Sequence, residues 1–151
     1  SSRYWYAVAM SSDGTKQTAV ENGGQIYVST DSGNTWTAKG SSRYWYAVAM
    51  SSDGTKQTAV ENGGQIYVST DSGNTWTAKG SSRYWYAVAM SSDGTKQTAV
   101  ENGGQIYVST DSGNTWTAKG SSRYWYAVAM SSDGTKQTAV VWGGQIYVST
   151  Q

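Results

Sequence analysis

Apolar and polar residues alternate in short runs along this chain, and small or turn-forming residues separate the runs. Over residues 4–10 the alternation predicts an extended strand that carries apolar side chains on both faces. One predicted face holds Tyr4, Tyr6, Val8 and Met10, and the other holds Trp5, Ala7 and Ala9. A strand that is apolar on both faces is buried on both sides, so we expect it to be the innermost strand of a sheet.

Three further strands are predicted before the pattern starts again. Residues 15–21 and 25–29 are rich in Val, Ile, Thr and Tyr, and the Asn-Gly-Gly of residues 22–24 between them has the composition of a turn. Residues 35–38 supply a fourth strand, and residues 39–42 form a link. Helix is not expected, because β-branched and aromatic residues dominate and glycine recurs throughout.

The whole pattern returns with a period of forty residues, unchanged from Ser1 to Val140. Four strand-sized segments in a unit of this length match a propeller blade in size and order. We therefore expect an all-β fold, a β-propeller of four-stranded antiparallel blades with four blades per chain. The predicted domain covers residues 1–151 as one propeller or half-propeller, with units at about 1–40, 41–80, 81–120 and 121–151.

One segment separates the third and fourth predicted strands of each unit, and in the first unit it reads Ser-Thr-Asp-Ser-Gly-Asn-Thr-Trp over residues 29–36. It predicts a folded turn: Asp31 accepts hydrogen bonds from the N–H groups that follow it, Gly33 permits a positive φ, and the Thr35 hydroxyl closes the turn. Trp36 then places a large ring in the adjoining layer.

The pattern Ser-x-Asp-x-Gly-x-Thr-Trp resembles the Asp-box, or BNR repeat, of the sialidase, sortilin and photosystem-assembly-factor propellers. The resemblance implies that the motif joins the third and fourth strands of a blade and is structural. It falls on Asp31, Gly33, Thr35, Trp36, Asp71, Gly73, Thr75, Trp76, Asp111, Gly113, Thr115 and Trp116. The unit also resembles an idealised consensus of these propellers and is similar to a computationally designed propeller of eightfold symmetry. Evolved repeats drift apart, so three consecutive identical units favour a designed sequence.

Composition bears on function mainly through what is absent. The chain has no Pro, Cys, His or Phe, but twelve Tyr and eight Trp. The commonest general base near neutral pH, the commonest metal ligand and the thiolate nucleophile are therefore missing. A formal net charge of +1 gives no electrostatic footprint for nucleic acid or for an anionic membrane. We expect a soluble protein without a targeting signal, nucleic-acid partner, membrane partner or cofactor.

The fourth unit departs from the others. Val141 and Trp142 replace the Glu-Asn of the earlier units, and Gln151 falls where the next motif would place its Asp. The fourth predicted strand of this unit is absent from the sequence, and we expect Val141 and Trp142 to cover the apolar surface beside it. An altered terminus without a structural purpose is the alternative.

An arc of four blades would leave an apolar face bare at each end, which monomers rarely tolerate. We expect self-association into an eight-bladed ring of two chains, a homodimer in which blade four of each chain meets blade one of the other. A closed four-bladed monomer is the alternative.

Candidate chemistry is sparse. Glycoside hydrolysis needs unlike residues in one cluster, whereas repetition gives every blade the same groups, so we expect no enzymatic activity. A calcium site at Asp31 would have one carboxylate only, which is too few for a hard cation. The best binding hypothesis is a multivalent or adventitious anion, or a glycan, at the central channel, held by a ring of Arg3, Arg43, Arg83 and Arg123. Charge pairing of each arginine with a nearby acid is the competing interpretation.

Overall fold

The computed structural model describes residues 2–150, and these residues form β-strands joined by turns, with no helix among them. The strands are β1 (Trp5–Met10), β2 (Gln17–Ser29), β3 (Thr37–Met50), β4 (Gln57–Ser69), β5 (Thr77–Met90), β6 (Gln97–Ser109), β7 (Thr117–Met130), β8 (Lys136–Val141) and β9 (Ile146–Thr150). The prediction of an all-β fold is confirmed. Within this described part, nothing has the length and apolar character of a membrane-spanning helix.

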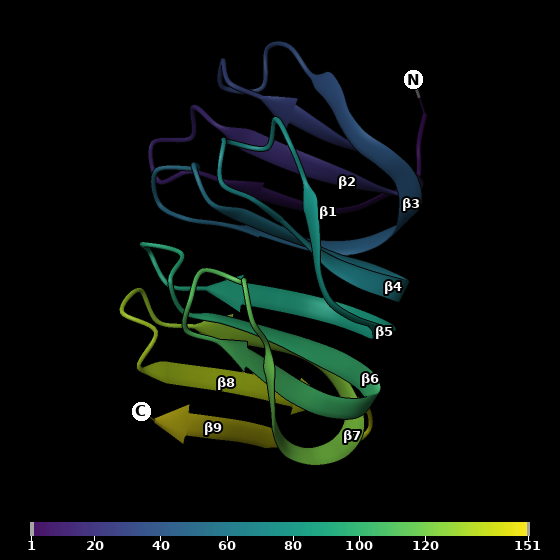
Figure 1. The fold of residues 1–151 in the computed structure, drawn as a ribbon, viewed down its shortest axis with the longest axis vertical. Coiled ribbons are helices and arrows are strands. Elements are labelled where there is room, and N and C mark those ends of the chain that lie inside the picture. The colour runs from purple at the N-terminus through teal and green to yellow at the C-terminus, as the bar shows by residue number, and fades with distance from the viewer. Residues whose placement is uncertain (1, 151) are drawn as a thin grey trace.

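The nine strands pair strictly in chain order, each antiparallel to the next, so β1 and β9 lie at the two ends of the pairing order. In Figure 1 the first strands lie in the upper half of the molecule and β8 and β9 lie at its lower end. The long strands β3 and β7 bend sharply, so that each takes part in two successive layers (Figure 1). The pairing repeats at the forty-residue period of the sequence.

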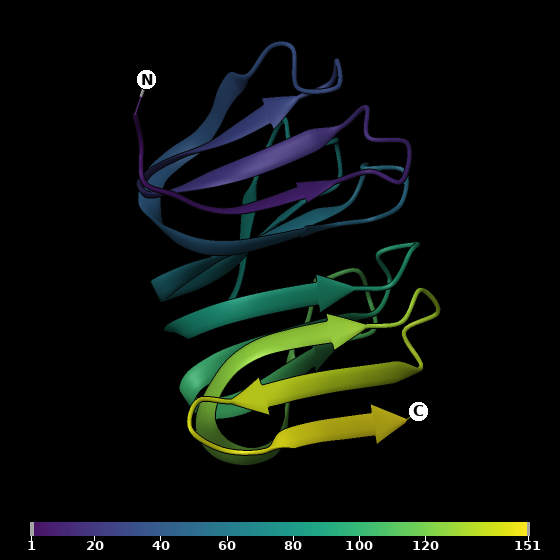
Figure 2. The same ribbon diagram turned by 180° about the vertical axis from the view of Figure 1, so that it is seen from behind.

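The long strands each combine two of the predicted short ones. Residues 22–24, predicted as a turn, lie inside β2, and residues 39–42, predicted as a link, lie inside β3. The reason is that the turn also pairs with the next unit: Asn22 pairs with Tyr44 and Gly24 with Arg43. In the fourth unit no further unit follows within the described residues, and the same segment separates into β8 and β9, the hairpin that the sequence predicts (Figure 2).

The predicted faces of the first strand are wrong in one respect. The register between β1 and β2 shifts between Trp5 and Ala7, which is a β-bulge, and the same shift recurs in every unit. Since a bulge moves the following side chains to the opposite face, Trp45 packs in one cluster together with Val48, whereas Ala47 packs in the next cluster. Strict alternation had placed the Trp with the two Ala residues.

The core lies between units. Its first cluster joins Val20, Ile26 and Val28 of unit one to residues of unit two, and the second cluster repeats this between units two and three. Trp45 and Trp85 are 1% exposed at the centres of these clusters. A single unit therefore depends on its neighbour for its core, as expected for stacked repeats.

Candidate functional site

The turn at residues 29–36 is closed by the side chains that the sequence singles out. The Thr35 hydroxyl donates to Asp31 Oδ2 over 2.6 Å, and the Thr35 amide donates to Asp31 Oδ1 over 2.8 Å. Ser29 Oγ donates to Asp31 Oδ1 and accepts from the Gly33 amide. The Trp36 indole N–H donates to the Gly33 carbonyl over 3.0 Å, which fixes the ring against the turn.

The backbone of this turn contains two successive residues with positive φ. Gly33 has φ of 85° and Ser32 has φ of 61°. Only the glycine is expected from the sequence, because a serine in the left-handed region is uncommon. The same geometry recurs at Ser72 and Ser112, so the hydrogen-bonded turn holds the serine in this conformation. The turns at residues 69–76 and 109–116 carry the same set of hydrogen bonds.

A second acidic turn, at residues 11–16, faces the same end of the sheet. Asp13 Oδ1 accepts from the Ser11 hydroxyl over 2.7 Å and from the Thr15 amide over 3.0 Å. The Ser32 amide donates to the Thr15 carbonyl, which ties this turn to the one at residues 29–36. Asp13-Gly14 is a sequence signal for a tight hairpin, but the sequence gives no signal for the contact between the two turns.

Hydrogen bonding holds the aspartates in both turns ionised. The Thr35 hydroxyl, the Thr35 amide and the Ser29 hydroxyl lower the pKa of Asp31 from 3.8 to about 2. The Ser11 hydroxyl and the Thr15 amide and hydroxyl lower the pKa of Asp13 to about 2. An acid that is stabilised as the carboxylate and tied to its own turn is a structural group rather than a proton donor.

The four arginines lie over tyrosine rings of their own units. The guanidinium carbon lies 4.7–4.9 Å from the ring centroid in all four pairs. Three of the arginines also form ion pairs within their units, with Nη1 to Oε2 distances of 3.0 Å for Arg3–Glu21 and 3.4 Å for Arg43–Glu61 and Arg83–Glu101. Among residues 2–150, Arg123 alone lacks such a partner, because Val141 replaces the glutamate. The anion ring stays a prediction, with three of its members already neutralised.

A ladder of aromatic rings connects the units. Tyr6, Tyr46, Tyr86 and Tyr126 contact one another in series, with tilted or edge-on rings whose centroids lie 5.0–5.6 Å apart. Trp142 continues the series, at 5.2 Å from Tyr126. Contacts of this kind contribute about 0.5–1.5 kcal/mol each beyond the area they bury.

The altered end of the fourth unit meets its predicted role only in part. Val141 packs against the cluster of Val100 and Trp125, as a residue that covers apolar surface would. Trp142 is 70% exposed and stacks on Tyr126 instead of filling the space beside the fourth unit, so that expectation for Trp142 is wrong. Gln151 lies outside the described residues.

The side-chain hydrogen bonds between units, and those of the serine amides, run in one direction. The amides of Ser12, Ser52 and Ser92 donate to the carbonyl forty residues further on, over 2.7–2.8 Å. The hydroxyls of Thr18, Thr58 and Thr98 donate to a glutamine of the following unit over 2.6 Å, at Gln57, Gln97 and Gln137 respectively. Each unit therefore presents donors to its successor and acceptors to its predecessor.

The two ends of the array expose the two halves of this contact. The front face of unit one comprises Trp5, Val8, Ala19, Tyr27 and Trp36, and it lines an open hollow. The copies of these residues in unit two lie in the core. Trp5 is 48% and Val8 62% exposed, against 1% and 8% for Trp45 and Val48.

The rear face of unit four is the other of the two surfaces that meet between neighbouring units. It comprises Ala127, Ala129, Val140, Ile146 and Val148, the counterparts of the unit-one residues that hold unit two. Ile146 and Val148 are 72% and 77% exposed, against 0% and 6% for Ile26 and Val28. The described residues thus present two complementary apolar faces, one on unit one and one on unit four.

Chemistry beyond packing has little support in the described residues. They contain no group of three or more acidic, His or Cys side chains that could hold a metal ion. Glu21, Glu61 and Glu101, the remaining carboxylates, are held by the arginines of their own units. Every buried side-chain nitrogen and oxygen in residues 2–150 has a hydrogen-bond partner, so no unsatisfied polar group marks a binding site.

Comparison with solved structures shows a β-propeller fold. The chain is similar to the Niastella koreensis GH74 enzyme, with a TM-score of 0.73 and 27% sequence identity over 97% of this chain and 23% of that chain. It is similar to YCF48 from Cyanidioschyzon merolae, with a TM-score of 0.69 and 17% identity over 99% of this chain and 57% of that one. It is also similar to U3-55K, with a TM-score of 0.81 and 12% identity over 98% and 49%.

These similarities concern the fold. The chain spans less than two thirds of the length of each of these proteins. No protein-family model matches the chain, and no curated protein matches it. The class defined by fold and contacts is therefore a β-propeller built from tandem repeats, and the neighbours include an enzyme without assigning its activity to this chain.

Proposed function

We propose that this chain is a computationally designed, symmetric propeller scaffold without a natural activity, and that its function is self-assembly. Each chain supplies four blades, of which the last lacks its outer strand in the described residues. Two chains join end to end into an eight-bladed ring. The identity of the first three units supports design, and the hydrogen bonds of the acidic turns support the Asp-box resemblance.

The observation that carries this proposal is the complementarity of the two ends. The front face of unit one and the rear face of unit four are the same surfaces that meet between units one and two. The backbone hydrogen bonds that link Ser12, Ser52, Ser92 and Ser132 leave the Ser132 amide at the rear face of unit four and the Ser12 carbonyl at the front face of unit one. Docking one chain on another continues both the apolar and the polar contacts.

Two chains satisfy both ends at once, because a two-fold axis places each rear face on the front face of the partner. A closed four-bladed monomer would bury Trp5 and Ile146 against each other, whereas both are exposed in this single chain. The similarity of the unit to a designed eightfold propeller supports eight blades. Each contact has the apolar character of a stable interface, for which about 1,600 Å² in total is typical.

Light scattering coupled to size-exclusion chromatography tests the proposal. We expect a mass near twice 16.2 kDa for the unmodified chain. Trp5→Ala removes the ring that anchors the front face and should shift the mass toward a single chain. Tyr84→Ala is the matched control, since Tyr84 is 63% exposed and lies on neither face. A single-chain mass for the unmodified protein at all concentrations contradicts the proposed ring.

Binding of a multivalent anion or a glycan at the ring channel is the second candidate. The unpaired Arg123 and the exposed rings of Tyr4, Tyr44, Tyr84 and Tyr124 are the observations that favour it. Calorimetry with a polyanion at low salt tests the anion, and the absence of heat at millimolar concentration would rule out anion binding.

A further inference from the structure

The contact between units one and two shows how a tryptophan and an outer strand fill the space between neighbouring units. Trp76 packs against the cluster that contains Ile26 and Trp45. Its Cδ1 atom lies 3.7 Å from the point that a Cβ on Gly40 would occupy. Trp116 occupies the corresponding place beside Gly80, at 3.6 Å. The small residue and the indole ring therefore fit together at both of these contacts.

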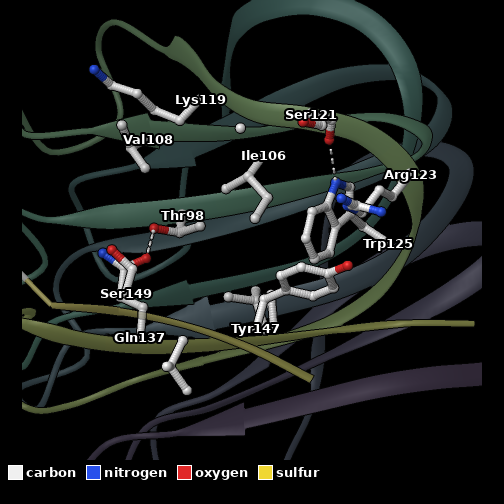
Figure 3. Close-up of a pocket in the computed structure, with 14 residues that line it drawn as sticks. Thr98, Ile106, Val108, Lys119, Ser121, Arg123, Trp125, Gln137, Tyr147 and Ser149 are labelled. Carbon is white, nitrogen blue, oxygen red and sulfur yellow. Dashed lines mark hydrogen bonds between the residues drawn. The ribbon is translucent and has the colours of Figure 1, made fainter. Parts of the chain in front are cut away.

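Between units three and four the same space is open. A groove of about 520 Å³ lies there, and its lining includes Ile106, Val108, Gly120, Trp125 and Tyr147 (Figure 3). Apart from Gly120 itself and its two chain neighbours, no described atom lies within 4 Å of a Cβ placed on Gly120. Ile106 and Val108 are partly exposed, whereas their counterparts Ile66 and Val68 are 0% and 6% exposed.

The backbone beside this groove also presents a free edge. In unit two, residues 66–68 of β4 pair with an outer strand formed by the first residues of β5. Ile66 lies opposite Lys79, Tyr67 opposite Ala78 and Val68 opposite Thr77. In unit four, β9 pairs with β8 on one side, and no described strand lies on its other side. Figure 2 shows β9 at the edge of the molecule. A row of unpaired N–H and C=O groups at such an edge can accept another strand.

We propose that this open groove, together with the outer edge of β9, is a strand-addition site for an extended peptide that carries a tryptophan followed by a short strand. The peptide backbone pairs with residues 146–148, in the register that residues 77–79 use in unit two. The tryptophan enters the groove beside Gly120 and packs on Ile106 and Trp125. Backbone pairing supplies affinity and the side-chain pocket supplies specificity, as in other cases of β-strand addition.

The occupant is a separate peptide segment rather than the end of a second copy. In each described unit that has an outer strand, that strand is already paired, as at residues 37–39. The front face of a second copy fits the rear face of unit four, whereas the groove lies between units three and four. The site is therefore filled independently of ring closure.

A fluorescently labelled peptide with the sequence of residues 29–40 provides the probe. Fluorescence anisotropy should show saturable binding to the unmodified chain. A peptide carrying Trp36→Ala should bind at least about tenfold more weakly, because it loses the ring that anchors it. In the protein, Val108→Lys places a charge in the groove and should abolish binding, whereas Trp5→Ala, which disrupts ring closure, should leave peptide affinity unchanged.

A second variant keeps the test decisive if Val108→Lys does not fold. In this variant residues 31–40 of the repeat replace Gln151, so that the chain supplies its own outer strand. Its unfolding midpoint should rise and it should no longer bind the peptide, because the groove is occupied. The proposal is overturned if the peptide shows no saturable binding at millimolar concentration, if the extended chain still binds it, or if binding only follows the formation of a two-chain mass.

Discussion

Trp45→Ala and Trp5→Ala form a matched pair that measures how much of each unit's stability comes from its neighbour. Both tryptophans lie edge-on to a tyrosine of their own unit, with ring centroids 5.1 Å apart for Trp45–Tyr67 and 5.2 Å for Trp5–Tyr27. They differ in whether a preceding unit covers the ring. Trp45 is 1% exposed beneath Val20, whereas Trp5 has no preceding unit and is 48% exposed.

The expected magnitudes follow from these exposures. Replacing a fully buried tryptophan with alanine costs about 3–5 kcal/mol of unfolding free energy, through lost transfer energy and the cavity that remains. Trp45 also donates its indole N–H to the Ser41 carbonyl over 3.3 Å, and this bond is lost too. Trp5 has about half of its surface in water already, so its replacement should cost about 1.5–2.5 kcal/mol by the same reasoning.

Urea unfolding followed by circular dichroism gives both values at a protein concentration where the mass is that of one chain. If two chains associate as proposed, the cost of Trp5→Ala should rise toward that of Trp45→Ala at concentrations where they do, because the proposed contact covers the Trp5 ring with the rear face of the partner. Equal losses in the single chain would refute the reasoning, since the preceding unit would then contribute nothing to the burial of Trp45.

Three further outcomes are expected. Hydrogen bonds lower the pKa of the turn aspartates in the folded state, so their contribution to stability should be fully present above pH 3.8 and should be lost as the pH falls through about 2. In an acid titration monitored by circular dichroism, part of this loss of stability should disappear when Asp31 and its copies are replaced by Asn. Thr58→Val should cost about 1–3 kcal/mol in urea unfolding because it leaves the buried Gln97 oxygen unpaired, whereas Thr138→Val, at an exposed position, should cost less than about 0.5 kcal/mol. Trp142→Asn should lower stability by about 0.5–1.5 kcal/mol by removing the stack on Tyr126, and no change in the thermal midpoint would show that this contact is energetically neutral.

The features that sequence reasoning predicted well are local. The turn at residues 29–36 closes through hydrogen bonds among Ser29, Asp31, Gly33 and Thr35, all within one short segment. Residue type and spacing are enough to predict such a turn, because few other partners are within reach. The all-β class follows in the same way from local strand propensity and the spacing of turns.

The features that could not be predicted depend on pairing across long separations. The bulge at Tyr6 reverses the faces of the first strand, yet either arrangement is compatible with the alternating sequence. The hydrogen bond from Thr18 to Gln57 joins residues thirty-nine positions apart, and nothing in either residue type points to the other. Trp142 was expected to cover the apolar surface left by the absent fourth strand, but its place between β8 and β9 brings it to Tyr126 instead.

The directional contacts between identical units leave two surfaces unmatched within the described residues. Four units in series form three contacts, and the front face of unit one and the rear face of unit four are left over. The open groove is of a different kind, because it lacks a strand within a unit rather than a neighbouring unit. The end faces and the groove should therefore bind their partners independently, the end faces a second chain and the groove a peptide. Independent binding would distinguish a scaffold of stacked units from a single cooperative core.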